Sequence, residues 1–261
     1  MCDEGGPSAY AEEALRAVLR AAHEGGGALP PGSQATRNAV CGAVADIWTA
    51  GRVLAARGPD APTARHLLPR VLLSGTEGLA VVLGTRLHGQ DASALRYGEC
   101  VRALTRAARR ADPRLAARVA SALPGVADGD DRLARPLTGV RASALPAVLG
   151  PVVAVLEAER LELAQGCGGL VEGGGSASLL GGERVSVLVE RYVLLSAAAD
   201  CLDGWRHRKA GAGTLTGDRA RLVGALSRIA GRLGLGGGPA SGWREVVFAG
   251  AVAERVFLAV S

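Results

Sequence analysis

The sequence is poor in aromatic residues, which make up only 3% of the chain. β-Strands favour aromatic and β-branched residues, whereas alanine, leucine and arginine, which dominate here beside glycine, favour helices. The same scarcity leaves few rings on which nucleic-acid bases could stack, and no helix-turn-helix recognition pattern stands out. Since 48% of the residues are hydrophobic, most of the chain is expected to fold, and to fold as helices.

Paired cysteines are also lacking. The five cysteines lie far apart without a Cys-x-x-Cys pair, and the four histidines fall on different predicted elements. Such a pattern fits neither a disulfide framework nor a zinc site. Cys201 falls on a predicted helix beside Leu202, with no nearby histidine that suggests activation, and is expected to be a small buried thiol. We therefore predict reduced thiols, no metal and a cytoplasmic location.

No long apolar run is present either. The N-terminus is acidic and has no apolar signal core, and the most apolar stretch, 142–156, is interrupted by Pro146, Gly150 and Pro151. A membrane-spanning helix needs about 20 apolar residues. The sequence therefore predicts no membrane segment.

The charge is mildly basic, with 30 Lys and Arg against 25 Asp and Glu, a formal net charge of +5 and a pI of about 9.3. A balance of this sign tolerates an acidic partner such as a nucleic acid, a carrier protein or a phosphorylated cofactor. The two signs are interspersed along the chain, which favours an ordinary mixed, solvated surface.

Hydrophobic periodicity predicts an all-α fold of about eight or nine helices in two groups. We expect a bundle over 1–127 and an additional helical region over 128–261, with a glycine-rich connector at 166–182. A bend is expected at Ser74-Gly75. The predicted helices are 11–22, 33–57, 63–86, 93–110, 113 to about 124, 145–165, 184–208, 217–233 and 243–260.

Standard catalytic motifs are absent from the sequence: there is no phosphate-binding Gly-x-x-x-x-Gly-Lys-Ser/Thr loop, no His-Glu-x-x-His and no Gly-x-Ser-x-Gly. The glycine run at 166–175 follows a predicted helix rather than a strand and lacks the Gly-x-Gly-x-x-Gly spacing. It therefore indicates a connector rather than a nucleotide loop.

Two polar patterns keep two interpretations each. Arg102, Arg106, Arg109 and Arg110 share one face of a predicted helix, which fits an anion site for a diphosphate or an acidic carrier protein, or a plain solvated face. Glu190, in the run Glu190-Arg191-Tyr192, either pairs with neighbours of Arg191 or a partner subunit, or lies on a helix surface.

Three segments in order resemble the helical C-terminal domain of acyl-CoA dehydrogenases, in a divergent bacterial branch of that family. The run 66–86 is similar to a long helix that ends in Val-Val-Leu-Gly-Ala-Arg. Residues 33–57, with Val44-Ala45-Asp46, resemble the family's helix carrying Leu-Ala-Asp. The stretch 188–205 resembles the extra C-terminal helices of the branch.

The resemblance implies an up-and-down helical bundle, with four helices that form one wall of a flavin and acyl-thioester site. Family members abstract an α-proton with a carboxylate and pass a hydride to FAD. Two motifs depart from the family: its Arg-Arg-x-x-Gly opening is replaced by 23–27, and its base-bearing loop by 110–114. The N-terminal helical and β-rich middle domains are expected to be missing.

Carried over residue by residue, the resemblance suggests Asp112 as the catalytic carboxylate, although Asp112 is also placed to cap the helix opened by Pro113. Arg106 and Arg110 are the candidates for binding the cofactor, FAD shared with a partner chain. No metal ligand is expected.

The predicted function is that of a partner subunit, or the C-terminal half, of a split flavin-dependent acyl-thioester dehydrogenase acting on acyl-CoA or acyl-carrier protein and inactive alone. The alternative is a non-catalytic helical scaffold or interaction protein. Expected partners are an acyl-CoA dehydrogenase-like subunit in a heterodimer, or a second copy of the chain, with an acyl-carrier protein as a further option; neither nucleic acid nor membrane is expected.

Overall fold

The computed structural model describes residues 6–24, 33–88, 91–109, 113–127, 147–172, 183–207, 215–235 and 242–258, which are helical apart from short turns and contain no strand. The prediction of an all-α bundle is confirmed. The elements are α1 (Pro7–Glu24), α2 (Gln34–Arg57), α3 (Pro62–Gly78), α4 (Ala80–Leu83), η1 (Gly84–His88), α5 (Ala92–Arg109), α6 (Pro113–Ala120), α7 (Leu123–Ala127), η3 (Ala147–Leu149), α9 (Gly150–Glu172), α10 (Glu183–Arg206), α11 (Leu215–Arg232) and α12 (Gly242–Leu258).

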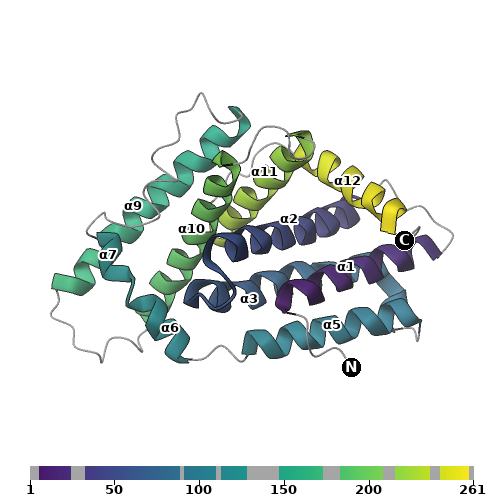
Figure 1. The fold of residues 1–261 in the computed structure, drawn as a ribbon, viewed down its shortest axis with the longest axis horizontal. Coiled ribbons are helices and arrows are strands. Elements are labelled where there is room, and N and C mark those ends of the chain that lie inside the picture. Colours follow the sequence, from purple (N-terminus) through teal and green to yellow (C-terminus); the bar gives the residue numbers. More distant parts are fainter. Residues whose placement is uncertain are drawn as a thin grey trace.

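Helix α2 lies at the centre of the molecule, because it packs against α1, α3, α10, α11 and α12 (Figure 1). Its ends follow from local chemistry. The Ser33 side chain accepts a hydrogen bond from the Thr36 amide at the start, and Gly58, with φ of 80°, ends the helix. Small buried residues such as Gly42, Ala43 and Ala45 let neighbouring helices approach α2 closely.

Helix α5 forms one edge of the molecule, where it packs on α1 and α3 (Figure 1). Its inner face buries Tyr97, Cys100 and Leu104. On the far side of α2, helices α9, α10, α11 and α12 complete the molecule, and α9 also packs on α7. The main hydrophobic core is one cluster with members from Ala11 of α1 to Val247 of α12, so it spans the predicted domain boundary at 127/128.

Two local predictions were wrong. The long segment 63–86 breaks at Gly78–Leu79 rather than at Ser74-Gly75, and Gly75 instead allows α3 to approach α2 closely. The first part of the glycine-rich connector is helical, because α9 runs on to Glu172. A Cβ on Gly166 would lie 3.2 Å from Leu188 of α10, so glycine at this position serves helix–helix contact. Residues 173–182 lie outside the described part of the chain.

Helix α2 and the stretch Pro62–His88 are both long and apolar enough to cross a membrane by length and composition. In each of them half of the apolar window is buried within the bundle. The core helix of a soluble protein meets the same criteria, so the membrane-free, cytoplasmic location stays a prediction.

Candidate functional site

Among the described residues, the most deeply buried charged group is Asp46, in the middle of α2, with 1% of its surface exposed. Arg228 and Arg232 of α11, one helical turn apart, each donate two hydrogen bonds to its carboxylate. The distances are 2.8 Å (Nε to Oδ1) and 2.6 Å (Nη2 to Oδ2) for Arg228, and 2.8 Å from each Nη for Arg232. Four charge-assisted bonds to one carboxylate make this a fixed structural joint between α2 and α11.

Two glycines leave the room that this joint needs. A Cβ on Gly75 of α3 would lie 2.4 Å from Asp46 Oδ2, and a Cβ on Gly42 of α2 would lie 2.6 Å from Arg228 Nη1. Real Cβ atoms essentially never come so near another heavy atom. The carboxylate therefore occupies the space in which α3 would otherwise carry a side chain.

Two further arginines bind carboxylates of other helices. Arg57 of α2 binds Asp200 of α10 through Nε to Oδ2 at 2.5 Å and Nη2 to Oδ1 at 3.0 Å, with side-chain exposures of only 12% and 11%. Arg191 of α10 binds the buried Glu159 of α9 and, at 3.1 Å, Glu162. Contact between α10 and α9 holds the pKa of Arg191 above its usual range, chiefly through the hydrogen bond to Glu159.

A mixed cluster joins α3 to α10. Glu190 accepts a hydrogen bond from Arg70 Nη1 at 2.9 Å and lies 3.4 Å from Nε2 of the buried His66. Within the described residues, Glu190 therefore pairs with residues of α3 in the same chain, while its side chain stays 44% exposed; pairing with a partner subunit stays a prediction. The hydrogen bond with His66, together with the charge of Arg70, holds the pKa of Glu190 below its usual range although partial burial opposes this.

Glu190 makes stability pH-dependent in a defined direction. A carboxyl whose pKa is lower in the folded chain stabilises it above the ordinary glutamate pKa, about 4.3, and this contribution is lost as the pH falls through the folded-state value. We expect Glu190→Gln to lower the free energy of unfolding at pH 7 and to lose this difference below about pH 4. Urea unfolding at several pH values tests this, with the exposed Glu99→Gln as the control. A difference that does not change with pH contradicts the assignment.

The buried cysteines are poor nucleophiles in this fold. Burial raises the pKa of Cys201 to about 12 and that of Cys41 to about 11, and it also raises the pKa of Cys167. Cys201 is fully buried, as the sequence predicted. Thiolate is the reactive form of cysteine, so these side chains act as packing groups near neutral pH.

We therefore expect Cys201 to resist alkylation in the native chain. Iodoacetamide at pH 8 should modify it about a hundredfold more slowly than in the guanidinium-unfolded chain, because reaction requires an opening of the core. Site-resolved mass spectrometry of a labelling time course measures the rate. Native and unfolded rates within about tenfold of each other would contradict the buried placement.

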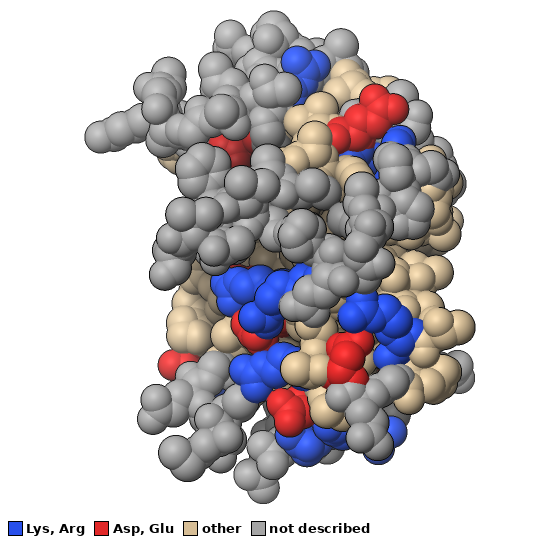
Figure 2. Space-filling model, turned by 90° about the vertical axis from the view of Figure 1, so that its right-hand side faces the viewer, with Lys and Arg blue, Asp and Glu red and all other residues tan. Residues whose placement is uncertain are grey.

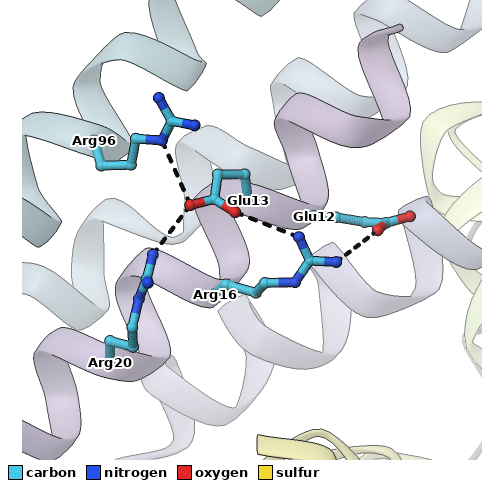
Figure 3. Close-up of polar contacts among 5 residues, drawn as sticks. All are labelled: Glu12, Glu13, Arg16, Arg20 and Arg96. Carbon is cyan, nitrogen blue, oxygen red and sulfur yellow. Dashed lines mark hydrogen bonds and ion pairs between the residues drawn. The ribbon is translucent and has the colours of Figure 1, made fainter. Parts of the chain in front are cut away.

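On the outer face of α1 and α5, acidic and basic side chains pair with one another at the surface. Glu13 of α1 accepts from Arg20 at 3.0 Å, from Arg16 at 3.3 Å and from Arg96 of α5 at 3.4 Å, as Figure 3 shows. Arg16 also reaches Glu12, and Arg96 reaches Glu99. Blue and red side chains accordingly alternate in the lower part of the face in Figure 2, at the height of these helices.

The predicted cofactor residues divide between described and undescribed parts of the chain. Arg106 is exposed on α5, in line with the exposed Arg102 and Arg109. The candidate catalytic residue Asp112 and the candidate Arg110 lie outside the described residues. Among the described residues, no group of three or more His, Cys, Asp or Glu side chains could hold a metal ion.

No model of a known protein family, no curated protein and no solved structure matches this chain. The resemblance to acyl-CoA dehydrogenases therefore stays a prediction from the sequence.

Proposed function

We propose that this chain is a helical interaction protein, a preformed scaffold that binds a partner protein on its outer helices. The observation that carries the proposal is how its arginines are distributed. Arg57, Arg191, Arg228 and Arg232 bind carboxylates of other helices and so hold the bundle together. The arginines in the second half of α5 face solvent, and no ion pair within the described residues engages them.

This division gives the two sets of arginine different roles. A guanidinium held by a buried carboxylate is committed to structure, because removing either partner leaves an uncompensated charge. A solvated guanidinium on a rigid helix keeps its planar donor fork free for a carboxylate or phosphate of another molecule. Rigid packing beneath it lowers the entropic cost of such binding.

A specific observation also supports a second candidate, a partner subunit of an FAD-dependent acyl-thioester dehydrogenase. Arg106, the candidate contact to the flavin diphosphate, is exposed and lies in line with Arg102 and Arg109. Clustered guanidiniums bind diphosphates through paired hydrogen bonds. In that case the partner chain would supply the remaining flavin contacts.

One experiment separates these candidates. The chain is purified alone, and again after co-expression with the product of any adjacent dehydrogenase-like gene, and each sample is characterised by light scattering and by its visible spectrum. The interaction function predicts a folded, colourless protein that self-associates or forms a complex. Flavin absorbance that disappears with Arg106→Ala or Asp112→Asn supports the dehydrogenase subunit instead. A colourless monomer that forms no complex contradicts both.

A further inference from the structure

One line of residues along α5 faces solvent from end to end. Leu95, Glu99, Arg102, Arg106 and Arg109, here called the α5 stripe, recur every three or four positions and so share one face of the helix. All five are exposed, and Leu95 keeps 54% of its surface accessible. The opposite face is the buried one that carries Tyr97, Cys100 and Leu104.

The charge along the stripe is strongly uneven. At the beginning of α5, Glu99 pairs with Arg96, and Arg96 in turn pairs with Glu13 in the network of Figure 3. Counting Glu99, that network contains three arginines and three carboxylates, those of Glu12, Glu13 and Glu99, so its charges balance. The second half of the stripe carries three arginines for which the described residues supply no carboxylate. These three arginines together carry a charge of +3.

Building on the proposed interaction function, we propose that the α5 stripe binds an acidic amphipathic helix of a partner protein. The rise of 1.5 Å per residue places Arg106 and Arg109 about 6 Å and about 10.5 Å along the axis from Arg102. Carboxylates at positions i, i+4 and i+7 of a second helix have the same spacing. Three arginine–carboxylate pairs can therefore form at once, each with the bidentate geometry that arginine favours.

Leu95 argues for a protein rather than a nucleic acid as the partner. It lies seven residues before Arg102 on the same line, about 10.5 Å along the helix, and it is an exposed large apolar side chain. A leucine has no counterpart in a phosphate backbone, whereas an amphipathic helix presents apolar side chains beside its acidic ones. Arginine is also enriched at protein interfaces relative to the rest of the surface.

A fluorescence-anisotropy titration of the intact chain tests the proposal. The probe is a labelled synthetic helix of about 20 residues, with glutamates at i, i+4 and i+7 and a leucine seven residues away on the same face. We expect the triple variant Arg102→Gln, Arg106→Gln and Arg109→Gln to bind it at least about tenfold more weakly. Leu95→Ser should weaken binding of the probe about threefold. An unchanged Kd would show that Leu95 is not an apolar anchor and would overturn an amphipathic partner.

A matched triple variant controls for net charge. Arg65, Arg184 and Arg219 are exposed on α3, α10 and α11, so changing all three to Gln alters the charge equally. The control should bind within about twofold of the unmodified chain; equal losses in both triple variants would overturn the proposal. If a DNA duplex binds more tightly than the helix probe and its binding depends on the same three arginines, the proposal is overturned in favour of a nucleic acid. If the probe fails to bind while the chain still self-associates or forms a complex, the stripe proposal fails and the interaction function stands.

Discussion

Replacing Asp46 with asparagine is expected to lower the free energy of unfolding by about 3 kcal/mol, and the midpoint of thermal unfolding by about 10 °C. The substitution keeps the shape of the side chain and removes its charge. Arg228 and Arg232 then face each other without the carboxylate that binds both, and the amide can accept fewer of their hydrogen bonds. Urea unfolding followed by circular dichroism at 222 nm measures the loss.

Asp203→Asn is the matched control for this experiment. Asp203 lies on α10; its side chain is 52% exposed and, within the described part of the chain, pairs with the exposed His207. An exposed pair contributes little, so the control should stay within about 0.5 kcal/mol of the unmodified chain. Equal stabilities for the Asp46 and Asp203 variants would show that the buried joint between α2 and α11 does not hold the fold together.

The second large effect is expected from Gly75→Ala, which should cost about 2 kcal/mol of stability. Alanine is the better helix former by about 1 kcal/mol, so propensity alone predicts the opposite sign. The added Cβ would lie 2.4 Å from Asp46 Oδ2 and 3.2 Å from Asp46 Cβ. That carboxylate is held by four hydrogen bonds, so α3 must move away from α2 or the joint must break.

Gly51→Ala on α2 provides the control for the glycine experiment. Nothing lies within 4 Å of the position that its Cβ would take, and the residue is exposed. The change is expected to stabilise the chain by up to about 1 kcal/mol through helix propensity alone. Stabilisation by both substitutions would contradict the close contact of Gly75 with Asp46.

Helix content and most helix positions could be predicted from the sequence, because they depend on local signals. Ser33 and Gly58 mark the two ends of α2, and the spacing of Tyr97 and Leu104 identifies the inner face of α5. Glycine was the main source of error. The sequence alone does not distinguish a glycine that breaks a helix from one, such as Gly75 or Gly166, that allows a second helix to approach.

The central polar joint could not be predicted, because Arg228 and Arg232 lie 182 and 186 positions after Asp46 in the chain. The sequence did contain partial signals: a lone aspartate in the apolar middle of α2, and two arginines one turn apart on α11. Each is ordinary alone. Only the packing of α11 across α2 brings them together, and local periodicity does not specify that crossing.

The joint also determines how the two parts of the chain are related. Asp46 and Arg57 lie in the predicted N-terminal bundle, and their partners Arg228, Arg232 and Asp200 lie in the C-terminal region. Together with a core that spans the boundary, these pairs are expected to make the helices one cooperative unit. A single rigid body is what an interaction surface such as the α5 stripe requires.

Native-state hydrogen exchange on the intact chain tests this unity most directly. The slowest amides of α2 and of α11 are expected to exchange with the same free energy of opening, equal to that of global unfolding, and to lose protection equally in the Asp46→Asn variant. A chain in which α9 to α12 exchange through a separate, lower-energy opening while α1 to α5 keep their protection would contradict a single preformed scaffold.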